Sequence, residues 1–214
     1  MIHLSTHDLG CCREGRLLFA HLDLTVRAGE VWRIEGPNGS GKTTLLNLLC
    51  GMNSDFDGRI AWQQRFLPTA RRELQHNVLY LGHRAGINSA LTPLDNLRWY
   101  QALRNTSTDD DACWRALDQV GLAGVEDVAV YHLSAGQQRR VQLARLLIES
   151  ARVWMLDEPF TSLDVDGVRQ VETWMSQHVC AGGSVILTTH QPLSPTLPVH
   201  RLCFDGAGQH AIVD

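Results

Sequence analysis

Residues 31–50 read VWRIEGPNGSGKTTLLNLLC, and this stretch decides the fold. Val31–Ile34 is a short apolar run of the kind that forms a buried strand, and a glycine-rich turn follows it. Thr43–Cys50 is rich in good helix formers, and Gly51 stands where a helix-ending glycine is expected. Strand, glycine-rich turn and helix in this order predict a phosphate-binding loop.

The turn itself, Gly36–Thr43, fits the pattern G-x-x-x-x-G-K-S/T. Its glycines let backbone amides curl around a β-phosphate, Lys42 can reach the β- and γ-phosphate oxygens, and the Thr43 hydroxyl can bind Mg²⁺. A chance glycine-rich turn is the alternative, but the strand before it and the helix after it are the context that the pattern requires. The predicted nucleotide contacts are Gly36, Pro37, Asn38, Gly39, Ser40, Gly41, Lys42, Thr43 and Thr44.

A pair of acids supplies the second half of the predicted machinery. Val153–Leu156 is a continuous apolar run that ends at Asp157 and Glu158, which is typical of a buried parallel strand with a polar tip. We assign Asp157 to Mg²⁺ and Glu158 to the attacking water. An ordinary acidic pair on the surface is the alternative, and the apolar run before it disfavours that interpretation.

The composition limits the class of protein. A chain of 214 residues with 44% apolar and 20% charged content predicts one compact unit. With 19 basic and 23 acidic residues, the chain has no excess of positive charge that would indicate a nucleic-acid partner. The six cysteines lack metal-ligand spacing, which favours buried thiols in a reducing compartment. No apolar run approaches the ~20 residues that span a bilayer, so we expect a cytosolic chain or one docked on a membrane partner.

The remaining apolar runs and capping residues complete an α/β pattern. A helix is expected from Pro93 through Leu103. The side-chain oxygens and negative charges of residues 106–111 suit the N-terminus of a second helix. Trp114, Leu117 and Val120 are expected to form the apolar face of that second helix. Beyond Asp205 the sequence predicts no element. Strands are predicted at Leu17–Phe19, Leu22–Val26, Gly58–Ala61, Val78–Leu81 and Ser184–Thr189, and helices at Gln138–Ile148 and around Val168–Val179.

One segment decides among the kinases, GTPases, helicases and transporters that share a phosphate loop and an acidic strand. Leu133–Gln137 reads LSAGQ and resembles the LSGGQ signature of ABC ATPases, with Ala135 in place of one glycine. Ser134 followed by Gln137 three residues later is also a helix capping box, and both interpretations can hold. On this resemblance the chain is an ATPase that uses ATP and Mg²⁺.

The resemblance covers essentially the whole chain and implies its fold and further site residues. The fold would be a P-loop NTPase (RecA-like) core with an N-terminal antiparallel β subdomain and a helical subdomain at about 87–150, all within one domain of residues 1–214. A homodimer would close on ATP, because the signature segment contacts the γ-phosphate held by the opposite copy. The residues implied are Ser134, Gly136 and Gln137 for that contact, Ser162–Asp164 for the D-loop, and His190 as a catalytic histidine that senses the γ-phosphate.

Two positions depart from the ABC ATPase pattern. His83 stands where the family usually has the Q-loop glutamine, which touches Mg²⁺ and the membrane subunit. Arg13 lies near the position of an aromatic ring that stacks on adenine, and a guanidinium plane can also stack on a base.

The chain resembles the ATP-binding subunits of cytochrome c maturation transporters. The segments that carry this resemblance are Ile34–Gly39, Leu81–His83 with Gly86–Ile87, Leu133–Arg140, Asp157–Thr161 and Leu187–Leu193. That resemblance implies a peripheral place on the cytoplasmic face of the bacterial inner membrane, beneath a CcmB-like membrane subunit, with further maturation components and a role in haem export or haem-chaperone release. The membrane partner is expected to dock on the segment from His83 to Tyr100. Trp99 and Tyr100 in this segment either face the partner or pack internally. The alternatives are the ATPase of another ABC importer or exporter, a soluble ABC ATPase, and a small-molecule kinase.

Overall fold

The computed structural model describes residues 1–83, 86–104 and 109–213, and the chain forms two compact units. The first unit contains residues 1–80, 151–158 and those from 175 onward. The second contains residues 81–150 and 159–174. In the part of the chain that the structure describes, no helix has the length and apolar character needed to cross a bilayer.

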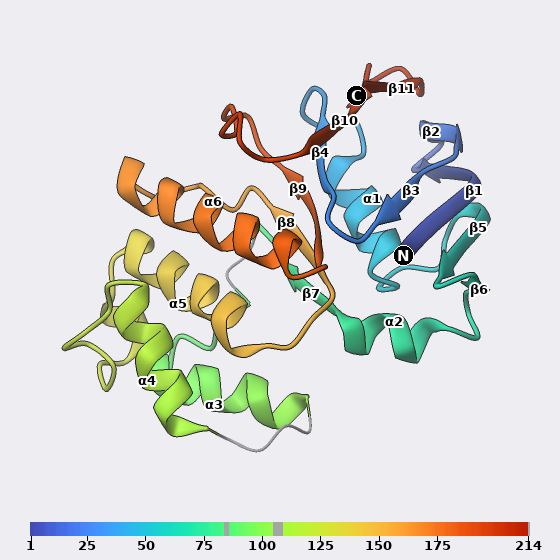
Figure 1. The fold of residues 1–214 in the computed structure, drawn as a ribbon. Coiled ribbons are helices and arrows are strands. Elements are labelled where there is room, and N and C mark those ends of the chain that lie inside the picture. Colours follow the sequence, from blue (N-terminus) through green and yellow to red (C-terminus); the bar gives the residue numbers. More distant parts are fainter. Residues whose placement is uncertain (84–85, 105–108, 214) are drawn as a thin grey trace. The chain divides into compact units, whose positions relative to one another are not determined.

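A six-stranded sheet forms the base of the first unit (Figure 1). Its order is β11-β10-β4-β9-β8-β7, with β10, β4, β9 and β8 parallel and β11 antiparallel at one edge. Every residue of β8 and β9 is buried, which explains why these strands are continuous apolar runs in the sequence. The strands are β4 (Val31–Glu35), β7 (Val78–Leu81), β8 (Val153–Asp157), β9 (Ser184–Thr188), β10 (Val199–Phe204) and β11 (His210–Val213).

An antiparallel sheet in the same unit confirms the predicted N-terminal β subdomain. Its order is β2-β1-β5-β6, and β3 also pairs with β1. The expected single strand over Leu22–Val26 is wrong, because the chain leaves β2 at Leu22 and enters β3 at Thr25. The strands are β1 (Ile2–Arg13), β2 (Arg16–Leu22), β3 (Thr25–Arg27), β5 (Asp57–Trp62) and β6 (Arg65–Phe66).

Helix α1 (Lys42–Leu49) joins the two sheets through one apolar core. Its four leucines are fully buried, and burial of a leucine side chain contributes about 1.5–3 kcal/mol. Gly51 follows the last turn with φ of +71°, the left-handed conformation expected of a helix-ending glycine. The core also contains Phe19, Ile34, Trp62, Met155 and Ile186.

The second unit is helical, and Figure 1 shows α3, α4 and α5 lying together in it. Thr92 caps α3 by accepting a hydrogen bond from the Asp95 amide at 3.1 Å, with Pro93 in the first turn. Asp109 caps α4 in the same way through the Ala112 amide at 2.9 Å. Part of the helix start predicted at residues 106–111 lies outside the described residues, at 106–108. The helices are α3 (Pro93–Leu103), α4 (Asp110–Gln119), the 3₁₀ turn η1 (Val130–His132), α5 (Ala135–Ile148) and α6 (Val165–Cys180), which runs on into the first unit.

Some elements differ from the sequence prediction for a physical reason. Trp114 is 39% exposed, so its assignment to the apolar face of α4 is wrong, and Cys113 and Ala116 join Leu117 in that face. Helix α2 (Arg71–Asn77) was not predicted because it buries only Leu74 and has no apolar period. The pairing of β11 with β10 likewise depends on backbone hydrogen bonds, since three of its four residues are exposed.

A partly buried histidine in the first unit makes stability depend on pH. The His178 ring of α6 stacks on Trp154 of β8 with centroids 3.9 Å apart and planes 7° apart. Burial lowers the pKa of His178 to about 4 from its usual 6.5. Between these two values the unfolded chain binds a proton that the folded chain excludes, so stability falls as the pH drops from 6.5 towards 4.

We therefore expect His178→Leu to reduce the loss of melting temperature between pH 7 and pH 5. At pH 5 the lowered pKa of His178 costs the folded chain roughly 1 kcal/mol of stability after allowance for partial exposure. This corresponds to a fall of about 2–4 °C in melting temperature. Thermal melts of the parent, His178→Leu and the exposed control His132→Leu at both pH values measure this difference. An unchanged pH dependence in His178→Leu contradicts the assignment.

Candidate functional site

The predicted phosphate loop leaves β4 and requires glycine at two positions. Gly36 has φ of +142°, and a Cβ there would lie 2.7 Å from the Phe204 carbonyl oxygen and 2.8 Å from Ser40 Oγ. Gly41 has φ of +104°, and a Cβ there would lie 3.1 Å from Leu18 Cβ. The Gly36 contacts are closer than a Cβ permits, and the Gly41 contact is tight. The loop therefore needs glycine for conformation at both positions and for space at Gly36.

Lys42 and the start of α1 form a cradle suited to an anion. The Lys42 ammonium donates to the Gly36 carbonyl at 2.7 Å and to the Pro37 carbonyl at 3.0 Å, which places it across the loop. Gly41 is the N-cap residue of α1 and has no side chain, so no N-cap side chain accepts a hydrogen bond from the amides of the first turn. The buried Ser40 Oγ also has no hydrogen-bond partner among the described residues. A phosphate group would satisfy these donors.

The Asp157 carboxylate connects the phosphate loop to two parallel strands. Thr43 Oγ1 donates to Asp157 Oδ2 at 2.8 Å, and Thr188 Oγ1 donates to Asp157 Oδ1 at 2.7 Å. The backbone amide of Glu158 donates in turn to Thr188 Oγ1 at 2.9 Å. Sequence reasoning did not assign Thr188 a role, although a hydroxyl at the end of an apolar strand was the signal for it. The four residues form one hydrogen-bonded network at the carboxyl edge of the sheet.

The donor set of this network fits Mg²⁺. Mg²⁺ prefers oxygen ligands and is usually held by one or two carboxylates, substrate phosphates and water. The Asp157 carboxylate and the adjacent Thr43 hydroxyl supply such oxygens beside the loop. In the described part of the chain, no three histidine, cysteine, aspartate or glutamate residues are grouped as an all-protein metal site.

The structure brings the two predicted catalytic residues together. His190 Nε2 lies 3.6 Å from Glu158 Oε1, and the histidine side chain is 67% exposed. Glu158 has φ of +50°, a conformation that costs about 1–3 kcal/mol in a residue with a side chain and persists only where its surroundings hold it. The geometry therefore presents a carboxylate with a histidine beside it at the end of β8.

Arg16, rather than Arg13, lies against the phosphate loop. Arg16 pairs with Arg13 across the β1–β2 hairpin and donates through Nη2 to the Gly206 carbonyl at 2.8 Å. Its Nη1 is 3.9 Å from the position of a Cβ on Gly39. Only the contact between distant strands identifies Arg16, so sequence reasoning missed it.

The predicted signature segment begins α5 in the second unit. The Gln137 amide donates to Ser134 Oγ at 3.2 Å, and the Ser134 amide donates to Gln137 Oε1 at 2.9 Å. The capping box is therefore confirmed, and the contact with nucleotide stays a prediction. A Cβ on Gly136 would lie 3.0 Å from the Ser162 carbonyl oxygen, so this glycine permits a close approach of the predicted D-loop.

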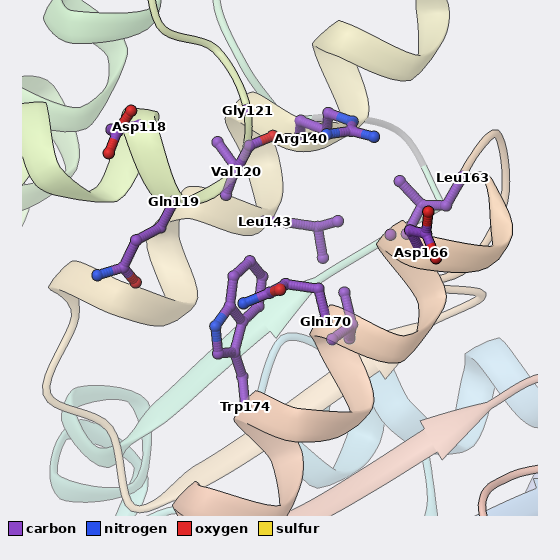
Figure 2. Close-up of a pocket in the computed structure, with 12 residues that line it drawn as sticks. Asp118, Gln119, Val120, Gly121, Arg140, Leu143, Leu163, Asp166, Gln170 and Trp174 are labelled. Atoms are coloured by element: carbon purple, nitrogen blue, oxygen red, sulfur yellow. Dashed lines mark hydrogen bonds between the residues drawn. The ribbon is translucent and has the colours of Figure 1, made fainter.

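Arg140 also joins α5 to the predicted D-loop. Its Nη2 lies 3.2 Å from Asp164 Oδ2, and its Nη1 donates to the Val120 carbonyl at 2.9 Å. Asp164 Oδ1 accepts from the Gly167 amide at 2.8 Å, at the beginning of α6. Arg140 lines a cavity of about 200 Å³ together with residues of α5, α6 and the end of α4. Figure 2 shows these side chains, among them Leu143 and Trp174.

The segment expected to dock on a membrane partner has one exposed and one partly buried aromatic ring, Trp99 and Tyr100. Trp99 is 49% exposed, and His83 is exposed as well. The Tyr100 ring instead packs beneath the Arg145 guanidinium, 3.6 Å from the ring centroid. Residues 84 and 85 of this segment lie outside the described residues.

Comparisons with known proteins agree on one family. Residues 19–161 match the family model described as ABC transporter. A protein of Pseudomonas fluorescens (strain Pf0-1) named cytochrome c biogenesis ATP-binding export protein CcmA is 50% identical over 191 residues, 89% of this chain and 90% of that protein. The protein of the same name from Yersinia pestis is 46% identical over 201 residues, 94% of this chain and 92% of its own length.

Solved structures show the same fold. A structure described as the ATP-binding subunit of an ABC transporter aligns with a TM-score of 0.87 at 20% identity, over 99% of this chain and 89% of that one. The dimeric structure of an ATP-binding cassette in a post-hydrolysis state, bound to ADP and Pi, aligns with a TM-score of 0.83 at 17% identity over 97% of both chains.

The loop geometry predicts that Gly36→Ala abolishes high-affinity nucleotide binding. The added methyl group would meet the Phe204 carbonyl and Ser40, so the loop must open, and we expect at least about tenfold weaker ATP binding, or 1.4 kcal/mol. Titration calorimetry with ATP measures the affinity. Gly15→Ala is the matched control, because Gly15 also has positive φ but a Cβ there meets nothing within 4 Å. Parent-like affinity in folded Gly36→Ala would show that the loop does not bind the phosphates.

Proposed function

The chain belongs to the ABC transporter family, and from this membership we propose that it drives a membrane partner in cytochrome c biogenesis. It is an ATP-binding and ATP-hydrolysing subunit. Relatives named for cytochrome c biogenesis match it along about nine-tenths of both chains, which supports the same role here. The resemblance to ABC ATPases inferred from the sequence is thereby confirmed.

The observation that carries the proposed chemistry is the network of Thr43, Asp157, Thr188 and Glu158. In this proposal the phosphate-loop amides and Lys42 bind the β- and γ-phosphates. Thr43 and Asp157 hold Mg²⁺, which neutralises charge on the phosphate oxygens when bound. Two hydroxyl donors fix the orientation of the Asp157 carboxylate before any nucleotide arrives, so its geometry is preorganised.

Glu158 and His190 would act on the attacking water and the γ-phosphate. The Glu158 carboxylate accepts a hydrogen bond from the water and aligns it with the γ-phosphorus. His190, 3.6 Å from that carboxylate, can donate to a γ-phosphate oxygen while its ring stays beside Glu158. Because the His190 side chain is largely exposed, it is free to respond to the nucleotide.

Ser134, Gly136 and Gln137 are proposed to bind the γ-phosphate of ATP held by a second copy of the chain. The support is the position of Ser134 at the start of the 14-residue helix α5, where amides and the helix dipole favour an anion. Ala135 introduces only a methyl group in place of the family's glycine, and Gly136 is retained. ATP would therefore join two copies as a homodimer.

The proposed place of the protein is the cytoplasmic face of the bacterial inner membrane, beneath a CcmB-like subunit. The support is the name of the relatives, which describes export proteins, and the exposed apolar residues of α3. Trp99 and Leu103 are 49% and 58% exposed, as suits side chains that a partner covers. Haem export or haem-chaperone release would then be the task of the whole complex, energised by this chain.

We expect Glu158→Gln to lower kcat by about 100-fold or more while ATP binding persists, because the amide cannot accept the water proton. Steady-state ATPase assays and ATP titrations measure the two quantities. Glu126→Gln, on the loop before η1, is the matched control with parent-like turnover expected. Parent-like hydrolysis by Glu158→Gln would remove Glu158 from the mechanism.

If the membrane subunit docks on the exposed residues of α3, Trp99→Ser should reduce its recovery when the chain is used as bait in detergent-solubilised membranes. The reduction should be about tenfold, since a buried tryptophan is a common energetic centre of an interface. Trp114→Ser on α4 is the control, because Trp114 is also partly exposed but lies outside the segment from His83 to Tyr100. Equal losses in both variants, or none in Trp99→Ser, would contradict the proposed surface.

A further inference from the structure

A buried arginine on the signature helix contacts the backbone of two distant segments. Arg139 is only 7% exposed. Its Nε donates to the Pro159 carbonyl at 3.2 Å, and its Nη1 donates to the Gly82 carbonyl at 3.3 Å. Gln142, one turn further along α5, donates to the same Gly82 carbonyl at 3.2 Å and is also bonded to Arg139. All four residues belong to the second unit.

The chemistry of the guanidinium makes this arrangement specific. A charge is costly to bury, so its donors must be matched by acceptors. The planar fork of arginine presents donors in fixed directions, which lets one side chain hold two carbonyls at a set separation. Arg139 and Gln142 lie three residues apart and therefore share one face of α5. That face is built to fix the backbone at Gly82 and Pro159.

Both carbonyls lie next to positions that matter for the reaction. Gly82 directly precedes His83, and Pro159 directly follows Glu158. The chain enters the second unit after Tyr80 and again after Glu158, so Arg139 holds the chain just beyond both of these points. Glu158 keeps a strained positive φ, and on its other side its amide is held by Thr188. Arg139 fixes the peptide between Pro159 and Phe160, and the Pro159 ring restricts the backbone rotation between that peptide and Glu158.

We propose that Arg139 is a positioning residue for ATP hydrolysis, which fixes the peptide between Pro159 and Phe160, one residue beyond Glu158, and the peptide before His83. This inference rests on the proposed role of Glu158. In this proposal Arg139 acts through Glu158 and not on the nucleotide itself. Its loss lets the Glu158 backbone relax from its strained conformation, so the carboxylate is presented in the wrong place. Nucleotide affinity is retained, because Lys42, Thr43 and the phosphate loop are not altered.

The test is Arg139→Met, which keeps the length and apolar stem of the side chain and removes every donor. We expect kcat per ATP-binding site to fall about tenfold or more, since misplacement by about 1 Å can cost that much, while KM stays within about twofold. Arg139→Lys should recover part of kcat, because an ammonium keeps the charge but lacks the fork. Hydrogen exchange should rise locally, at residues 81–83 and 159–162.

Controls separate this inference from a simple loss of folding and from failure of the proposed function. Arg115→Met, on the exposed face of α4, should match the parent in turnover and exchange. Counting sites by ATP titration removes the effect of any unfolded fraction. If Arg139→Met and Arg139→Lys both retain parent turnover per site while Glu158→Gln is inactive, the positioning role is overturned and the proposed function stands. If Glu158→Gln is as active as the parent, the proposed role of Glu158 is contradicted, and the positioning role of Arg139 is contradicted with it.

Discussion

The buried carboxylate of Asp157 is the interaction on which the rest of the structure depends. Asp157 is only 3% exposed, and its carboxylate accepts hydrogen bonds from Thr43 of α1 and from Thr188 of β9. Those two bonds tie the helix after the phosphate loop to two neighbouring strands of the parallel sheet. The position of α1 is therefore set by the same atoms that are proposed to hold Mg²⁺. Packing of its four leucines into the core then fixes the helix along its length.

The close approach of the phosphate loop to Phe204 sets a second constraint. Strand β10 pairs with β4, so its last residue lies directly beneath Gly36. The loop can curl only because no side chain intervenes there. This explains why an apparently uninformative C-terminal segment contributes to the nucleotide site: β10 and the turn after it form the wall against which Gly36 and Arg16 rest.

Strain at Glu158 connects the site to the second unit. A glutamate in the left-handed region is held on one side by Thr188, in the first unit, and is followed by a proline whose carbonyl is bound by Arg139. The signature helix thus has two faces with separate tasks. Its N-terminus carries the capping box of Ser134 and Gln137, and its buried face holds the backbone at Gly82 and Pro159. This division explains why α5 contains a buried charge where an apolar residue would pack at lower cost.

The sequence by itself determined the family, the class of fold, the phosphate loop and the acidic pair, because each is local: a run of glycines between a strand and a helix, and carboxylates directly after an apolar strand. It also determined the caps of α4 and α5, which involve residues three positions apart. Only the tertiary structure decided the roles of Thr188, Arg16 and Arg139, the exposure of Trp114, and the strand β1. Thr6 shows the reason, since it is buried in β1 and bonded to Leu22 and Leu24. Contacts between distant segments satisfy such polar groups, and no local pattern reports those contacts.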